Sequence, residues 1–197
     1  MAIIVDKVQK KRDIALSCKS LFIQKGINHI TIAEVAKTAG VGKGTIYEYF
    51  KNKEEIVFEI TNIMMQEHEE KLQREIAKMN STKDKIKKFS EFFYDEDDFE
   101  LREIYKEFTS ISLINPNDEM IAFQTEANNH FFNLFKSVIE DGVKSHELIP
   151  ESLSLAQGIF STGKGLFIMS TITNSIDDLK KELDLYIDTI FKLMEVK

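Results

Sequence analysis

The fold of the N-terminal region follows from residues 31–56, which read TIAEVAKTAGVGKGTIYEYFKNKEEI. Thr31 precedes Glu34 by three residues, a spacing typical of a capping box, in which two side chains satisfy free amides at a helix start. The helix that follows ends near Ala39, and Gly40 then supplies a tight turn. Its apolar face consists of Ile32, Val35 and Ala36.

A second short helix fits residues 43–50. Ile46 and Phe50 lie four residues apart and therefore share its inner face. Two short helices joined by a glycine turn predict a helix-turn-helix, whose second helix enters the major groove of DNA.

A longer helix is expected before this pair, at residues 7–25. Gly26 follows its last turn, where a left-handed cap is favoured. Its apolar stripe consists of Ile14, Cys18, Leu21 and Phe22. Because Cys18 lies on this stripe, we interpret it as a packed core thiol and not as a reactive one. Residues 1–53 are thus predicted to form a three-helix DNA-binding domain.

The outward residues of the second short helix carry groups that suit DNA. Gly42 and Gly44 let backbone amides approach a phosphate, and Lys43 adds a cation. Hydroxyl groups for phosphates or base edges come from Thr45, Tyr47 and Tyr49. The alternative for the two tyrosines is that their rings pack on the protein surface.

The next helix opens at residue 53. Asn52 and Glu55 form a second capping pair, and Lys53 lies where a phosphate would meet the N-terminus of this helix. A long helix over residues 53–79 is expected from here.

Residues 8–60 resemble the signature of the TetR/AcrR family of transcriptional repressors. The resemblance rests on the spacing of Gly40, Gly44, Tyr47, Phe50 and Lys53. It implies DNA contacts by Thr31, Gly42, Lys43, Gly44, Thr45, Tyr47, Tyr49 and Lys53. Two residues depart from the pattern. Gly42 replaces a frequent serine, which removes one hydroxyl donor, and Glu48 puts an acidic side chain on the recognition helix.

Charge is unevenly distributed along the 197 residues. The whole chain has a net charge of −7, which excludes a uniformly basic nucleic-acid binder. Residues 7–53 contain ten cationic and three anionic side chains, a net charge of +7, so the remainder carries −14. This division favours one module that meets a polyanion and another that does not.

Several classes of protein are not expected from the composition. A single cysteine excludes a disulfide framework, and no apolar run reaches the roughly 18 residues that a membrane span requires. No signal peptide is recognised, so we expect a cytoplasmic protein that does not bind membranes. Neither a cofactor nor a metal is expected.

The rest of the chain has helical periodicity throughout, which predicts an all-α fold of about nine helices. Only Pro116 and Pro150 are strong helix stops. Residues 54–197 are expected to form a helical domain for ligand sensing and dimerisation. Its further helices are expected at residues 82–93, 97–113, 117–145, 152–173 and 176–195.

The middle of the chain is rich in aromatic residues, which favours a core or an apolar cavity. The TetR resemblance implies that a small apolar or aromatic effector binds between the corresponding helices. The candidate ligand-binding residues are Phe89, Phe92, Phe93, Tyr105, Phe108, Phe123, Glu126, His130 and Phe131. For Glu126 and His130, which lie four residues apart, the alternative is a surface or mutually satisfied pair.

The last two helices are expected to form a dimer interface. Small residues recur every seven positions in the first, and the second carries more apolar surface than one partner helix covers. The candidate interface residues are Ala156, Gly163, Phe167, Ser170, Leu183, Tyr186, Ile187, Ile190 and Met194. The resemblance implies a four-helix seam, a palindromic operator on double-stranded DNA, and an effector that releases DNA by tilting the fourth helix.

The alternative function is an enzyme or nucleotide-binding protein. Residues 158–165 (GIFSTGKG) are one residue short of a P-loop, because Gly165 stands where Ser or Thr should bind magnesium. The preceding segment also has a helical pattern, whereas a P-loop follows a strand. We therefore predict a regulator and not an enzyme.

Overall fold

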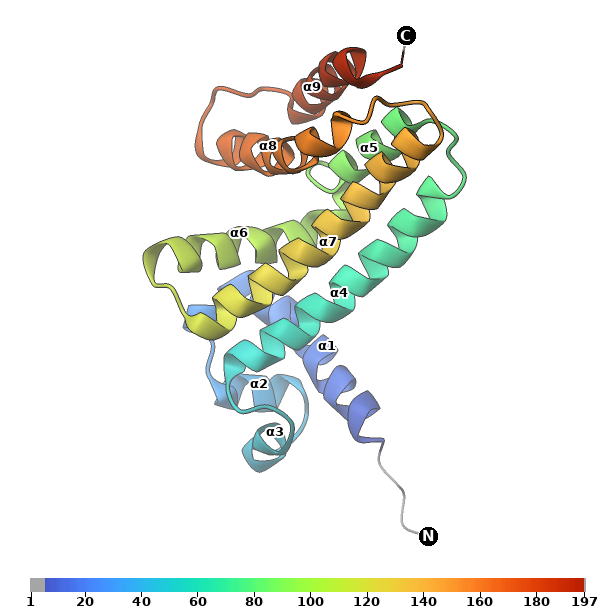
Figure 1. Cartoon of the computed structure of the whole chain (residues 1–197). Helices are drawn as coiled ribbons and strands as arrows, with labels where there is room; N and C mark the ends of the chain where they lie inside the picture. The colour runs from blue at the N-terminus through green and yellow to red at the C-terminus, as the bar shows by residue number, and fades with distance from the viewer. Residues whose placement is uncertain (1–5, 197) are drawn as a thin grey trace. The chain divides into compact units, whose positions relative to one another are not determined.

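The computed structural model describes residues 6–196. Within them the chain forms nine α-helices, which confirms the all-α prediction (Figure 1). They are α1 Lys7–Lys25, α2 Ile32–Thr38, α3 Lys43–Tyr49, α4 Lys53–Ile76, α5 Thr82–Glu91, α6 Phe99–Ile114, α7 Asp118–Lys144, α8 Ser152–Ile172 and α9 Leu179–Met194. Two 3-10 turns, at Ile27–His29 and Glu96–Asp98, precede α2 and α6. No helix in this part of the chain combines the length and apolarity that crossing a membrane requires.

Helix boundaries agree with the sequence prediction to within a few residues, and local capping explains the differences. The last helix was expected from residue 176 but begins at Leu179, because the Asp178 carboxylate accepts a hydrogen bond from the Lys181 amide at 2.9 Å. Similarly, Asp95 accepts from the Asp97 amide at 3.0 Å, and the acidic run becomes a 3-10 turn before α6.

The chain divides into two compact units that do not follow the expected boundary at residue 53. Unit 1 comprises the residues up to His68 together with Glu103–Met120, and unit 2 comprises Glu69–Arg102 and Ile121–Lys197. The first part of α4 belongs to unit 1 because its apolar side chains are buried there. These side chains are Ile56, Val57, Ile60 and Ile63.

The core of unit 1 contains the stripe predicted for the first helix. Ile14, Cys18 and Phe22 are buried, and the Cys18 thiol lies 3.6 Å from the Val35 carbonyl oxygen. Burial raises the pKa of this thiol, which favours its protonated form. The interpretation of Cys18 as a core residue is thus confirmed.

Unit 2 has its own core, built mainly by α5, α7, α8 and α9, and α9 packs against both α5 and α8. The fully buried members of this core include Ile86, Ile139, Leu148, Phe191 and Met194. Ion pairs join the outer faces of α5 and α9, with the Lys87 ammonium 2.9 Å from Asp188.

Candidate functional site

The start of α2 is fixed by the predicted capping box. The Thr31 hydroxyl accepts a hydrogen bond from the Glu34 amide at 3.3 Å and donates to Glu34 Oε2 at 2.9 Å. Glu34 Oε2 also accepts from the Thr31 amide at 3.0 Å, and the Lys25 ammonium lies 2.6 Å from Glu34 Oε1. The bond from Lys25, followed by those from Thr31, lowers the pKa of Glu34 to about 2. A DNA phosphate would therefore compete with Glu34 for the Thr31 hydroxyl proton.

The turn between α2 and α3 has the geometry that the glycine predicts. Gly40 has φ +66°, and the Val41 amide donates to the Ala36 carbonyl at 3.0 Å. Ile46 and Phe50 are buried, which fixes the orientation of α3 about its axis. The helix-turn-helix is thus formed by these residues as predicted.

The opposite face of α3 is open to solvent. Tyr47 is 59% exposed, and Lys43 and Glu48 are exposed as well. Thr45 and Tyr49 are half-buried. Gly42 and Gly44 are exposed, and a Cβ atom on either would meet nothing within 4 Å. The backbone at the start of α3 is therefore accessible to a polyanion.

Lys53 at the start of α4 lies beside the start of α2. Its ammonium donates to the Ile30 carbonyl at 3.4 Å, and Ile30 directly precedes Thr31. The predicted second cap is present, since the Glu55 amide donates to Asn52 Oδ1 at 2.8 Å. Thr31 and Lys53, two of the predicted DNA contacts, are thus brought together.

One carboxylate in unit 1 was missed by the sequence analysis. Glu107 of α6 accepts a hydrogen bond from the backbone amide of Ile27, at the junction between α1 and α2. The two residues are 80 positions apart, and no local pattern in the sequence pairs them.

The phenylalanines of unit 2 form contacts between α7 and α8, between α5 and α7, and between the segment that follows α5 and α8. The ring centroid of Phe93 lies 5.5 Å from that of Phe167, and Phe89 contacts Phe135 edge-on at 5.4 Å. Phe160, which was not among the candidates, lies 5.5 Å from Phe132 and 5.4 Å from Phe135. We call this set the phenylalanine cluster: Phe89, Phe92, Phe93, Phe132, Phe135, Phe160 and Phe167.

Other ligand-binding candidates lie elsewhere. Tyr105 and Phe108 belong to unit 1, where Phe108 is buried and contacts Phe58 edge-on at 5.9 Å. Burial raises the pKa of the Tyr105 hydroxyl. Phe123 and Phe131 are half-buried on α7 in unit 2.

Glu126 and His130 do not form a buried polar pair. Both are exposed, with 56% of the His130 side chain accessible, and His130 Nε2 lies 2.8 Å from Glu69 Oε2 on α4. The surface alternative therefore describes them, because this face of α7 points to solvent. Neither residue is therefore a candidate for a buried ligand-binding site.

A different polar group adjoins the phenylalanine cluster. The Lys164 ammonium donates to Asn128 Oδ1 at 2.6 Å and lies 4.7 Å from the Phe160 ring centroid. Burial lowers its pKa, because desolvation disfavours the charged form.

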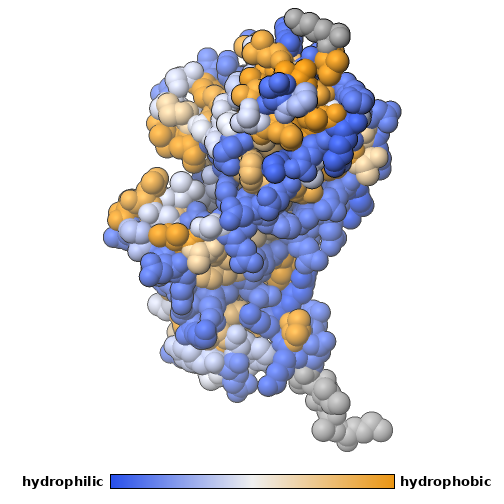
Figure 2. Space-filling view, viewed as in Figure 1, coloured by the Kyte–Doolittle hydropathy of each residue, from blue (hydrophilic) through white to orange (hydrophobic). Residues whose placement is uncertain are grey.

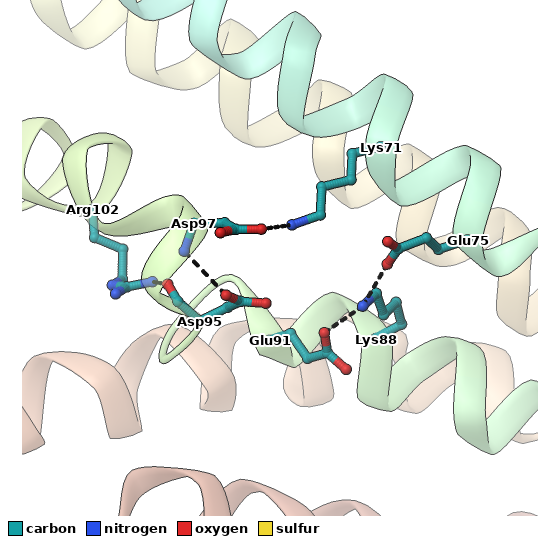
Figure 3. Close-up of polar contacts among 7 residues, drawn as sticks. All are labelled: Lys71, Glu75, Lys88, Glu91, Asp95, Asp97 and Arg102. Atoms are coloured by element: carbon teal, nitrogen blue, oxygen red, sulfur yellow. Dashed lines mark hydrogen bonds and ion pairs between the residues drawn. The ribbon is translucent and has the colours of Figure 1, made fainter.

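Charged groups also connect α4 to α5 and to the turn before α6 (Figure 3). Lys88 pairs with Glu75 and Glu91. Burial lowers the pKa of Lys88, but the bonds to these carboxylates outweigh it and raise the pKa above its usual value. Nearby, the Lys71 ammonium lies 2.7 Å from Asp97, and this bond raises the pKa of Lys71 and lowers that of Asp97.

The predicted dimer-interface set requires a correction, because most of it is buried within a single chain. Ile187 is only 3% exposed and packs in the core of unit 2. The other buried members are Ala156, Gly163, Phe167, Leu183 and Met194, whereas Ser170, Tyr186 and Ile190 are half-buried. The apolar stripes identified in the sequence are therefore the inward faces of α8 and α9.

The near-P-loop segment does not form a phosphate-binding loop. Residues 158–165 lie inside α8, where backbone amides are used in helical hydrogen bonds. The structure therefore gives no support to the nucleotide-binding alternative.

Comparisons with known proteins agree with this arrangement. A sequence model described as "Bacterial regulatory proteins, tetR family" matches residues 18–60. The fatty acid metabolism regulator protein of Bacillus subtilis is 26% identical over 197 residues, 95% of each chain. The transcriptional regulator QacR of Staphylococcus aureus is 26% identical over 129 residues, which cover 63% of this chain and 65% of QacR.

Solved structures have the same fold. A TetR-family regulator from Cytophaga hutchinsonii superimposes with a TM-score of 0.81 over 98% of both chains, at 16% identity. The regulator FadR from Bacillus subtilis, solved in complex with stearoyl-CoA, has a TM-score of 0.67 at 25% identity and covers 91% of this chain and 96% of FadR. These relatives are regulators of transcription and not enzymes. The matched helix-turn-helix, the full-length relative and the shared helical fold together support a DNA-binding transcriptional regulator of the TetR family.

Proposed function

We propose that the protein is a homodimeric repressor that binds a palindromic operator and leaves it when a small effector binds. The observation that carries this proposal is the exposed face of α3, which presents Tyr47 and Lys43 while Ile46 and Phe50 hold the helix from behind. Because the proposed target is chromosomal DNA, we place the protein in the cytoplasm.

In this proposal, α3 lies in the major groove. Lys43, Lys53 and the amides near Gly42 bind phosphates. Gly44 lets the start of α3 approach the DNA, and Thr45, Tyr47 and Tyr49 contact phosphates or base edges. Thr31 contributes through the cap that fixes α2, and its hydroxyl reaches a phosphate only by giving up its bond to Glu34.

The proposed dimer uses the exposed faces of α8 and α9. Figure 2 shows hydrophobic surface over these helices. On α9, Leu185 and Leu193 are 59% and 69% exposed. On α8, Met169 and Ile172 are exposed, and Gly158 and Gly165 have open space around them, so a partner helix can approach closely. A two-fold pairing of this kind would present two recognition helices to a palindromic site.

The proposed effector is a long-chain acyl-CoA. The phenylalanine cluster supplies the apolar surroundings that an acyl chain requires. Support comes from the name of the B. subtilis relative and from the stearoyl-CoA bound to FadR. Phe123 and Phe131 on α7 remain candidates for the same region, whereas Tyr105 and Phe108 belong to unit 1 and are not assigned to it.

A binding selection tests the DNA half of the proposal. The purified protein is incubated with a random duplex pool at low salt, and retained duplexes are sequenced. Recovery of an inverted repeat, bound by two chains, supports the proposal. Retention of no sequence above background contradicts it. In vitro transcription from a promoter carrying the selected site then tests whether the bound protein represses or activates transcription. An increase in transcript would contradict repression.

A release assay tests the effector. The selected duplex carries a fluorophore, and its anisotropy is followed while stearoyl-CoA, butyryl-CoA or free CoA is added. We expect release by stearoyl-CoA alone, because only its chain is long enough to fill an apolar region. Release by free CoA, or by none of the three, would contradict a long-chain acyl effector.

A further inference from the structure

The junction between α1 and α2 depends on a side chain from α6. Gly26 ends α1 with φ +75°, and its amide donates to the Phe22 carbonyl at 2.8 Å. The His29 amide donates to the Gly26 carbonyl at 3.3 Å. The amide of Ile27, a residue whose side chain is buried, donates to the carboxylate of Glu107.

This contact is close and specific. A Cβ atom on Gly26 would lie 2.8 Å from Glu107 Oε1, so the carboxylate occupies the space that a side chain at position 26 would take. Burial raises the pKa of Glu107 above its ordinary value. The bond from Ile27 and the nearby side chains of His29 and Lys53 oppose this shift without cancelling it. The Glu107 carboxylate thus lies close to the Ile27 amide and to the side chains of His29 and Lys53.

The start of α6 is hydrogen-bonded to the segment that precedes it. The guanidinium of Arg102, a buried residue, donates to the carbonyl oxygen of Phe92 at 2.8 Å. It also donates to the carbonyl oxygen of Asp95 (Figure 3). Phe92 belongs to the phenylalanine cluster. Arg102 lies five residues before Glu107 on α6.

We propose that Glu107 is a positioning residue for DNA binding, and that α6 acts on the helix-turn-helix through its bond to the Ile27 amide. Ile27 lies five residues before α2, so the bond sets the direction in which α2 and α3 leave α1. This inference rests on the proposed function, because it assigns a residue to the binding of DNA.

Two variants of Glu107 and a control distinguish a role in positioning the helix-turn-helix from a general effect on folding stability. Glu107→Ala removes the acceptor, Glu107→Gln keeps an oxygen acceptor without the charge, and Glu103→Ala removes a carboxylate one turn earlier that pairs with Lys106. Affinity for the selected duplex is measured by anisotropy at several salt concentrations, at a temperature where circular dichroism shows each variant fully folded.

We expect Glu107→Ala to weaken DNA binding about tenfold or more, because it leaves a backbone amide without its partner. The slope of log affinity against log salt stays unchanged, since no phosphate contact is lost. Glu107→Gln restores most of the affinity, and Glu103→Ala has wild-type affinity.

Wild-type affinity in folded Glu107→Ala would overturn the inference, as would an equal loss in Glu107→Gln or in Glu103→Ala. A wild-type protein that binds no duplex would instead contradict the proposed function. The two failures are therefore distinguishable.

Discussion

Lys43 and Lys53 illustrate how two cations predicted for the same task differ in the folded chain. Lys43 is exposed on the open face of α3, whereas the Lys53 ammonium donates to the Ile30 carbonyl at 3.4 Å. Replacing Lys53 therefore affects the local structure as well as any phosphate contact. Lys43 is the cleaner residue for testing the DNA interface.

We expect Lys43→Ala to weaken binding to all duplexes and to lower the salt slope by about one unit, because one phosphate contact is lost. Anisotropy titrations at several salt concentrations measure the slope. Lys136→Ala is the matched control, since this lysine pairs with Glu140 on α7. An unchanged slope in Lys43→Ala would remove Lys43 from the phosphate contacts.

Glu34 makes the stability of the folded protein depend on pH, and the direction of this dependence follows from its pKa. Its pKa is lowered from 4.5 to about 2, first by the bond from Lys25 and then by those from Thr31. Its stabilising effect is therefore complete above the ordinary pKa and is lost as the pH falls toward about 2. We expect Glu34→Gln to lose less stability between about pH 5 and pH 2 than the wild type. Thermal unfolding by circular dichroism across this range measures the difference, and parallel curves would contradict it.

Among the helices, α8 and α9 show why an apolar stripe alone does not identify an interface. Their most regular stripes are buried in unit 2, and the residues left outside are fewer and less regular. Adding a charged side chain is expected to affect the outer and inner faces of these helices differently. A carboxylate on the outer face leaves the core of unit 2 intact, whereas one on the inner face is buried.

We expect Leu185→Asp with Leu193→Asp to give a folded monomer, because the proposed seam then carries buried like charges. Ile187→Asp is expected to unfold the protein, since an unpaired carboxylate in a core is costly. Leu113→Asp, at an exposed position on α6, serves as a control that remains dimeric. Light scattering and circular dichroism measure mass and folding. A persistent dimer in the double variant would place the interface elsewhere.

The phenylalanine cluster is the element in which effector response is expected to change. Phe132 of α7 is half-buried against Phe160, so truncating it removes an apolar contact near the proposed acyl chain. We expect Phe132→Ala to raise the stearoyl-CoA concentration needed for release more than it changes DNA affinity. The opposite pattern in the release assay would exclude Phe132 from the effector region.

Two properties of the whole molecule bear on DNA binding: the uneven distribution of charge and the proposed coupling between effector and DNA. Residues 7–53 carry a net charge of +7 and the remainder −14, so we expect only the N-terminal part of the chain to associate with the duplex. In the proposed mechanism, coupling between effector and DNA is reciprocal, because both ligands would bias one conformational equilibrium.

We therefore expect the selected duplex to weaken stearoyl-CoA binding by the same factor by which stearoyl-CoA weakens duplex binding. Calorimetric titration of stearoyl-CoA, with and without a saturating duplex, measures this factor. A scrambled duplex of equal length is the control. Equal effector affinity in both titrations would contradict a coupled mechanism.

Several features of the molecule were determined by the sequence alone. The nine helices, the two capping pairs and the buried or open faces of α3 follow from interactions within a few residues, and such local interactions are readable in order along the chain. Ile46 and Tyr47 are adjacent, yet helical periodicity correctly separated the buried side chain from the exposed one.

Other features were decided only by tertiary structure. Whether the apolar face of α9 meets its own chain or a partner depends on how much surface α5 and α8 already cover, which no local pattern encodes. Likewise, the bond from Ile27 to Glu107 and that between His130 and Glu69 join residues 80 and 61 positions apart. Partners at such separations are chosen when helices pack, because a polar group near the core binds whichever complementary group the packing brings within reach.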